Sequence, residues 1–181
     1  MPDPSAIPSH ASGAAEAEAT VWSQLFLEHS RSLLNYCLYR VGDLATAEDL
    51  AADVFQRAWR ARRRYNPRRG EFSTWLFTIA RRRTTDWQRR QARRRIVELD
   101  EQLPSSLPGP DILTAEADDR RRLRELIQAL PVDDQELIAL KFGGGMTNRQ
   151  IACIIGKSET AVGSAIYRLV RKLRVQWEEV R

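Results

Sequence analysis

The sequence has few of the residues that build metal centres or disulfide frameworks. Its 181 residues include two cysteines, Cys37 and Cys153, and two histidines, His10 and His29, with no metal-ligand spacing among them. This argues against a zinc module or a disulfide scaffold, and we expect neither a metal nor a cofactor. Because the two cysteines lie far apart inside apolar helical patterns, a reducing cytosol fits, and the expected location is cytoplasmic.

Long apolar runs and strand patterns are missing too. No run approaches the roughly 20 apolar residues that span a bilayer, and the start lacks the basic-then-apolar order of a signal peptide. We therefore expect a protein with no membrane contact of its own. Strict alternation of apolar and polar residues is almost absent, so the expected fold class is all-α.

Positive charge is in excess and is clustered. Lysine and arginine number 29 against 24 aspartate and glutamate, which gives a formal net charge of +5. Eight arginines fall between Arg81 and Arg95. Arginine forks match phosphate geometry, so the cluster favours a nucleic-acid partner. The alternative is a charged face that only meets solvent.

The composition divides the chain into two helical blocks. Residues 1–19 are small, polar and interrupted by prolines, which indicates a flexible lead. Helical apolar patterns fill residues 20–95 and 114–181. Residues 96–113 between them hold three prolines, a glycine and two serines, which indicates a flexible linker. Extended at about 3.1 Å per residue, this linker spans some 50 to 60 Å, enough for two small domains to occupy distant surfaces.

A pair of short helices is predicted within residues 146–173. Thr147 is placed to cap the first helix, with Gln150 three residues later as in a capping box, and Gly156 ends it. Ser158 then caps a second helix whose exposed side is cationic. The pattern is typical of a helix-turn-helix, whose second helix enters the DNA major groove. An ordinary helical hairpin is the alternative.

Three carboxylates gather on one helix of the N-terminal block. Glu48, Asp49 and Asp53 lie on or beside the exposed side of a helix predicted after Asp43, and five arginines follow in its later turns. This charge order also complements the helix dipole. From the residues alone, a docking face for a basic partner and simple dipole complementarity remain equally open.

The next predicted helix is mainly apolar in its first half and rich in arginine in its second half. It begins near Ser73, carries Trp75 among apolar residues, and then becomes arginine-rich with Trp87 interleaved. Aromatic rings beside arginines suit single-stranded nucleic acid, because bases stack on the rings while guanidinium groups follow the phosphates. Trp75 nevertheless fits a core position better, since aromatic residues at helical spacing are usually buried.

Several motifs, taken in order, resemble those of bacterial sigma factors of the extracytoplasmic-function (ECF) group. They are AEDLAADVFQRAW, FSTWLFTIARRRTTDWQRR, a proline-containing linker, and LPVDDQELIALKFGGGMTNRQIACIIGKSETAVGSAIYRLVRKLR, and the resemblance covers about residues 22–177. These factors bind core RNA polymerase, direct it to promoters and help to melt the DNA. The resemblance thus implies a DNA-binding transcription initiation factor and not an enzyme. Control by an anti-sigma factor is typical of the family, although no residue here indicates one.

The resemblance also implies roles for three sets of residues. It implies that core polymerase is bound by Glu48, Asp49, Asp53 and Gln56. This favours a docking face over dipole complementarity as the role of the acidic helix. Binding of the melted minus-ten element falls to Tyr65, Arg68, Arg69, Phe72, Trp75, Arg81, Arg82, Arg83, Trp87, Arg89 and Arg90. Binding of the minus-thirty-five duplex falls to Thr147, Arg149, Ser158, Glu159, Thr160, Ser164, Arg168, Arg171 and Lys172. The domains implied are a region 2-like domain at 20–95 and a region 4-like domain at 114–181.

Two departures from the family pattern concern DNA readout. Gly163 and Ala165 stand where many relatives carry a lysine and an arginine, so we expect close approach of small residues to replace charge there. Arg82 stands where many relatives have an asparagine facing the flipped base, so their base preference does not carry over.

Three other functions are weighed against the resemblance. A stand-alone helix-turn-helix regulator would account for the sequence of residues 115–181, but it would assign no function to residues 22–95. A nuclease needs a nucleophile with a base, or metal ligands, and the acidic helix has no such supporting group. A pure interaction protein would use the carboxylates for a partner and the arginines for solubility alone.

Overall fold

The computed structural model describes residues 10–98 and 115–179, so the first nine residues and most of the predicted linker lie outside the described part. The described residues form helices and short connections, with no strand among them, which confirms the all-α prediction. One boundary differs from expectation. Residues 10–19, predicted as flexible, already belong to the first helix, because their Ala- and Glu-rich sequence favours helix despite the small polar composition.

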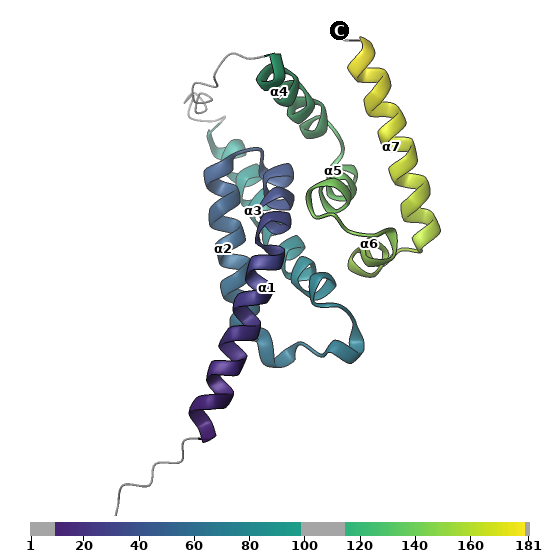
Figure 1. The fold of residues 1–181 in the computed structure, drawn as a ribbon. Coiled ribbons are helices and arrows are strands. Elements are labelled where there is room, and N and C mark those ends of the chain that lie inside the picture. Colours follow the sequence, from purple (N-terminus) through teal and green to yellow (C-terminus); the bar gives the residue numbers. More distant parts are fainter. Residues whose placement is uncertain (1–9, 99–114, 180–181) are drawn as a thin grey trace, which may run out of the picture.

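The N-terminal block consists of three helices that pack against one another (Figure 1). They are α1 (His10–Val41), α2 (Leu44–Ala61) and α3 (Phe72–Glu98). Asp43 caps α2, its carboxylate accepting a hydrogen bond of 2.8 Å from the backbone N–H of Thr46. Two 3₁₀ turns, Arg62–Arg64 and Pro67–Arg69, connect α2 to α3. These turns form the loop that precedes the arginine-rich helix.

The C-terminal block contains the predicted helix-turn-helix. Its helices are α4 (Ala115–Gln128), α5 (Val132–Ile138) continued by the wider π-helical turn η3 (Ala139–Gly143), α6 (Asn148–Ile155) and α7 (Glu159–Glu179). The capping box before α6 is confirmed, since Thr147 Oγ1 accepts from the Gln150 N–H and Gln150 Oε1 accepts from the Thr147 N–H at 2.8 Å. Gly156 ends α6 in the left-handed region at φ 70°.

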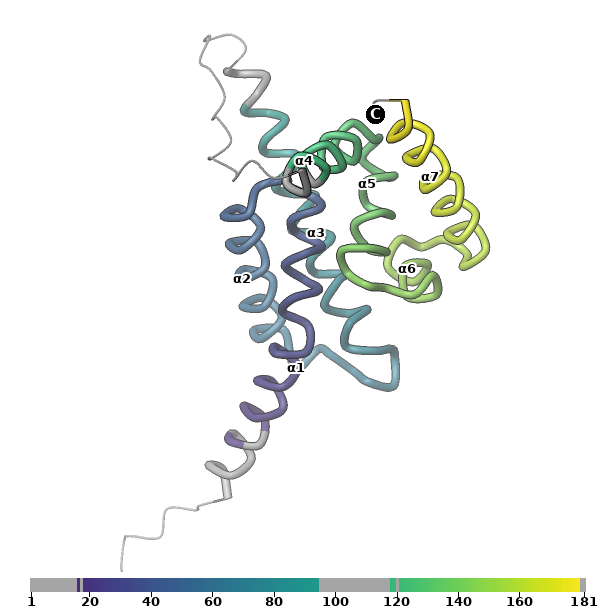
Figure 2. Tube along the Cα trace, turned by 45° about the horizontal axis from the view of Figure 1, so that its top comes forward, coloured from purple at the N-terminus to yellow at the C-terminus, as the bar shows by residue number. Residues whose placement is uncertain are grey.

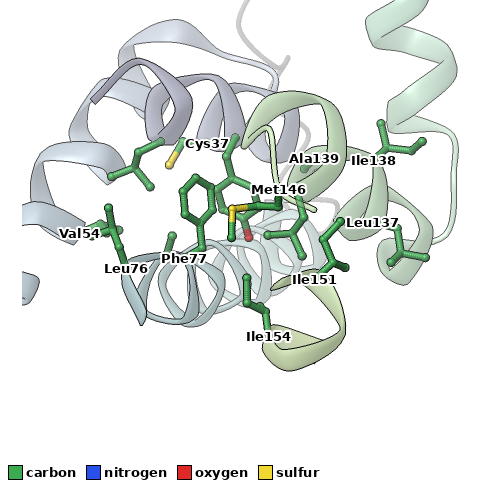
Figure 3. Close-up of a cluster of buried hydrophobic side chains, with 14 of the residues drawn as sticks. Cys37, Val54, Leu76, Phe77, Leu137, Ile138, Ala139, Met146, Ile151 and Ile154 are labelled. Carbon is green, nitrogen blue, oxygen red and sulfur yellow. The ribbon is translucent and has the colours of Figure 1, made fainter. Parts of the chain in front are cut away.

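The two blocks share one hydrophobic core. Buried side chains of the N-terminal block, among them Leu76 and Phe77, form a continuous cluster with Leu137, Met146 and Ile151 of the C-terminal block (Figure 3). Helix α1 packs against η3, and α3 packs against α6. Both overall views show the C-terminal block along one side of the α1–α3 bundle, with α2 on the opposite side (Figures 1 and 2). The two predicted domains therefore touch along their length in this structure.

Two adjacent glycines allow this close approach. A Cβ atom at Gly143 would lie 2.9 Å from the Cα atom of Tyr36, and one at Gly144 would lie 2.6 Å from the ring of Phe77. Real Cβ atoms essentially never sit that close to a neighbour. Glycine at both positions is therefore what lets η3 rest on the backbone of α1 and on α3.

Candidate nucleic-acid interface

The carboxylates predicted to dock on polymerase belong to α2, the helix on the far side of the α1–α3 bundle from the C-terminal block (Figure 1). Glu48, Asp49 and Gln56 are exposed there. Asp53 differs, because its carboxylate accepts hydrogen bonds from Arg57 at 3.0 Å and from Arg83 of α3 at 2.5 Å. Burial raises the pKa of the Asp53 carboxyl, but the hydrogen bonds and charges of the two arginines outweigh burial and lower the pKa below its usual value. Asp53 therefore ties α2 to α3.

The aromatic residues predicted near the minus-ten element form a cluster around Phe72. The Phe72 ring is only 7 % exposed and lies edge-on to Trp22 at 5.5 Å and to Tyr65 at 5.4 Å. Trp75 lies against the same ring, with the centroids 5.6 Å apart. Tyr65, Trp75 and Trp87 are half-buried and pack on the core. Phe72 thus supports Tyr65 and Trp75 from inside, and both of these residues are less buried than Phe72.

The loop before α3 presents two arginines to solvent. Arg68 and Arg69 are exposed on the Pro67–Arg69 turn. The turn is fixed by Asn66, whose side-chain oxygen accepts a hydrogen bond of 2.9 Å from the backbone N–H of Arg68. Local hydrogen bonding therefore fixes the backbone of the turn that carries both arginines, between Tyr65 and Phe72 of the aromatic cluster.

The arginines of α3 fall into two groups. Arg82, Arg89 and Arg90 are exposed, and within residues 10–98 and 115–179 their guanidinium groups form no hydrogen bond or ion pair with another side chain. Arg83 bonds Asp53, as described above, and Arg81 lies 3.9 Å from the carboxylate of Glu136 in the C-terminal block. The sequence alone did not distinguish these groups, because all five arginines belong to the same basic run. Their burial depends on which helix lies across α3.

Helix α7 exposes most residues predicted to bind duplex DNA. Thr160, Ser164, Arg168 and Arg171 recur three or four residues apart along one exposed side of the helix. The other predicted residues of this set are also exposed: Thr147, Arg149, Ser158, Glu159 and Lys172. Both hydroxyl and cationic groups therefore stand on the surface that a major groove would meet.

One exposed residue of this side of α7, Tyr167, is not among the residues predicted from the sequence to bind DNA. Tyr167 is 70 % exposed and lies next to Ser164 and Arg168 on α7. Its helical spacing, three residues after Ser164, is the signal that would have found it. An exposed tyrosine ring with a hydroxyl at its tip can contact either a base edge or a phosphate.

The two small residues of α7 are half-buried, on either side of the buried stripe that ends in the core. A Cβ atom at Gly163 would lie 3.2 Å from the side-chain nitrogen of Asn148 in α6, and Ala165 packs on the hydrophobic core. Their small size therefore serves packing within the helix-turn-helix, and the expectation that they bring the helix close to DNA stays a prediction.

Other chemistry is not apparent within residues 10–98 and 115–179. This part of the chain contains no group of three potential metal ligands and no helix long and apolar enough to cross a membrane. The thiol of Cys37 is buried, and burial raises its pKa to about 12, which makes it unreactive, whereas Cys153 is exposed on α6.

Comparison with known proteins covers both blocks. The family profile for Sigma-70 region 2 matches residues 25–94, and that for Sigma-70, region 4 matches residues 120–173. The first match accounts for the block that a stand-alone helix-turn-helix regulator would leave unexplained.

Curated relatives give the same result along most of the chain. SigL, an ECF RNA polymerase sigma factor of Mycobacterium tuberculosis (strain H37Rv), is 33% identical over 171 residues, which cover 93% of this chain and 96% of SigL. BldN, an ECF RNA polymerase sigma factor of Streptomyces coelicolor, is 32% identical over 162 residues. That alignment covers 88% of this chain and 61% of BldN, so the chain spans less than two thirds of that relative's length.

Solved structures share the fold. The sigma factor RpoE of Bartonella quintana, crystallised with the anti-sigma factor NepR, gives a TM-score of 0.70 at 22% identity and covers 88% of this chain and 98% of that one. CnrH, in complex with the cytosolic domain of CnrY, gives 0.68 at 22% identity, with coverage of 93% and 95%. With both sigma regions present in order and a relative matched over nearly its whole length, the chain belongs to the ECF family of RNA polymerase sigma factors, the transcription initiation factors that direct RNA polymerase to promoters.

Proposed function

We propose that the chain performs the three tasks of a sigma factor with three separate surfaces. Glu48, Asp49 and Gln56 on α2 bind core RNA polymerase. The loop at residues 65–75 and the exposed arginines of α3 hold the melted minus-ten strand. The exposed side of α7 reads the minus-thirty-five duplex. The observation that carries the assignment is the exposure of the polar side of α7 within a capped helix-turn-helix.

Charge and shape support this division of tasks. The first turns of α2 expose Glu48 and Asp49, ahead of the exposed Arg57 and Arg60, and this acidic end suits a basic partner surface and repels DNA. Arg68 and Arg69 are exposed on the loop between Tyr65 and Phe72, and Arg82 is exposed further along α3, the helix that carries Trp75. Cations and half-buried aromatic rings on one segment suit unstacked bases and their phosphates. The chain then acts by binding alone, without an enzymatic activity, in the cytoplasm where the polymerase works. Because two similar structures are complexes with partner proteins, one of them named as an anti-sigma factor, we include an anti-sigma factor among the partners.

Reconstituted transcription tests the assignment. Purified chain is mixed with core RNA polymerase from its own cells and a library of promoter fragments, and run-off transcripts are sequenced. We expect transcripts that start at defined positions and depend on the added chain, while the free chain binds duplex DNA only weakly. Core enzyme that neither retains the chain in a pull-down nor gains new start sites would contradict the proposal.

The cations of α7 give a second prediction. Replacing Arg168 or Arg171 with alanine should weaken binding to the selected promoter duplex on every sequence tested and should lower the slope of log affinity against log salt by about 1 per arginine, because each lost phosphate contact releases one fewer counterion. Fluorescence anisotropy over a salt series measures the slope. Arg121→Ala is the charge-matched control, since Arg121 lies on α4 and pairs with Asp118. An unchanged slope in the α7 variants would mean that these side chains miss the phosphates.

A further inference from the structure

A residue without a side chain on α7 leaves a polar group of α6 uncovered. Gly163 lies three residues after Thr160 and four before Tyr167, so it borders the exposed side of α7. Apart from its chain neighbours and the backbone of its own helix, a Cβ atom at Gly163 would meet only the side-chain nitrogen of Asn148 within 4 Å, at 3.2 Å. Any longer side chain at this position would therefore crowd or cover the Asn148 carboxamide.

The neighbours of the Asn148 carboxamide fix which of its ends faces Gly163. Lys141 of η3 donates from Nζ to the Asn148 side-chain oxygen over 3.1 Å. An ammonium group can only donate, so the oxygen must face Lys141 and the NH₂ group must face Gly163. Within residues 10–98 and 115–179, no acceptor takes a hydrogen bond from this NH₂ group, and the buried side-chain nitrogens that lack a partner belong to two arginines. The NH₂ group is therefore an unused donor that solvent or a ligand can reach.

The place of Asn148 in the helix-turn-helix favours a phosphate as its acceptor. In this motif the second helix enters the major groove, whereas the first helix crosses the DNA backbone. Asn148 is the first residue of α6, the first of the two helices, and the residues on either side of it, Thr147 and Arg149, are exposed. Phosphate oxygens commonly accept hydrogen bonds from asparagine side chains. Because Gly163 has no side chain, α7 presents no obstacle there between a phosphate and the NH₂ group.

We propose that Asn148 donates a hydrogen bond to one backbone phosphate of the minus-thirty-five duplex, through the space that Gly163 leaves open. Lys141 acts as a positioning residue, because it holds the oxygen of the carboxamide and so turns the NH₂ group toward Gly163. This inference rests on the proposed function, in which α7 binds that duplex. A phosphate held from α6 limits how far the duplex can shift along α7, so the contact positions the base-reading residues without reading a base itself.

Replacing Asn148 with alanine should weaken binding of the selected promoter duplex by about tenfold, because a hydrogen bond to a charged acceptor is lost. The full chain is assembled with core RNA polymerase, and fluorescence anisotropy of the labelled duplex measures the affinity over a salt series. The slope of log affinity against log salt should stay at the parent value, since a neutral amide releases no counterion. Asn35→Ala, which removes an exposed carboxamide from α1, is the matched control and should bind like the parent chain.

Single methylphosphonate substitutions in the duplex locate the contact, because each replaces one charged phosphate with a neutral group. At one phosphate of the minus-thirty-five element, the substitution should weaken binding of the parent chain about tenfold and of Asn148→Ala only about twofold, since two changes to the same contact are not additive. Arg168→Ala should keep the full loss at this phosphate. The absence of any phosphate with this coupling, or coupling to a base pair in place of a phosphate, overturns the inference.

Two further variants test the space at Gly163 and the role of Lys141. Gly163→Ala places a methyl group 3.2 Å from the Asn148 nitrogen and should weaken duplex binding several-fold. Its thermal unfolding should stay close to that of the parent chain, because the higher helix propensity of alanine offsets the tight contact. Lys141→Met frees the carboxamide to rotate and should weaken binding about threefold, with a smaller coupling at the same phosphate. A purely structural role of Asn148 predicts unchanged binding for Gly163→Ala.

The outcomes separate this inference from the function on which it rests. Circular dichroism shows whether each variant is folded, and should Asn148→Ala unfold, the coupling measured in Gly163→Ala decides the question. If Arg168→Ala weakens binding and a folded Asn148→Ala does not, only the phosphate contact from α6 is rejected. If the parent chain forms no specific promoter complex with core polymerase, the proposed function is rejected and this inference with it.

Discussion

Reversing both exposed carboxylates of α2, as Glu48→Arg with Asp49→Arg, is expected to weaken capture of core RNA polymerase by about 100-fold or more. Both side chains are exposed on the proposed docking side, and like charges brought together across an interface cost several kcal/mol. Because they are surface residues, helix content and thermal stability should stay close to those of the parent chain. A titration of labelled chain with core enzyme, repeated at low and high salt, measures the loss.

The design leaves Asp53 untouched for a structural reason. Asp53 bonds Arg83, so its reversal would loosen α2 from α3 and confuse docking with folding. Asp118→Arg with Asp119→Arg carries the same change in net charge at exposed positions of a different helix, α4, and should leave capture unchanged. If the α2 variant still binds core polymerase as tightly as the parent chain, these carboxylates serve only to complement the helix dipole.

Phe77→Ala should lower the free energy of unfolding by about 3–5 kcal/mol. The ring is 1 % exposed, lies 5.4 Å from the ring of Tyr36 and fills the space over Gly144, so its removal leaves a cavity at the centre of the shared core (Figure 3). For a chain of this size each kcal/mol shifts the unfolding temperature by about 2–4 °C, which predicts a decrease of roughly 10 °C.

Thermal and urea unfolding followed by circular dichroism measure this loss. Leu27→Ala is the control, because Leu27 is 74 % exposed on α1 and its truncation should change the free energy of unfolding by less than about 0.5 kcal/mol. Equal losses in the two variants would mean that Phe77 is not held in a packed core.

The parts predicted correctly from sequence are those that neighbouring residues determine. Thr147 and Gln150 satisfy each other's backbone groups within one turn, and Gly156 ends α6 by its own left-handed conformation. Such signals need no knowledge of the rest of the fold. The sequence alone is therefore enough to locate the helix-turn-helix and to predict its exposed side.

Contacts between the blocks could not be predicted in the same way. Glu136 looks like a surface residue in a polar helix, and only the arrival of Tyr36, 100 positions earlier in the sequence, makes it a buried acceptor. Arg81 and Arg82 are identical neighbours, yet α6 lies across the first and leaves the second exposed. Gly163 lies against Asn148 of another helix, a contact that the sequence of α7 does not reveal. Each of these outcomes depends on tertiary packing.

The short ion pair between Asp53 and Arg83 makes α2 and α3 one mechanical unit. If polymerase docks on α2 as proposed, the same contact would also set the angle at which Arg82, Arg89 and Arg90 meet the opened strand. The orientation of these arginines would then depend on the docking step, although they lie on a different helix.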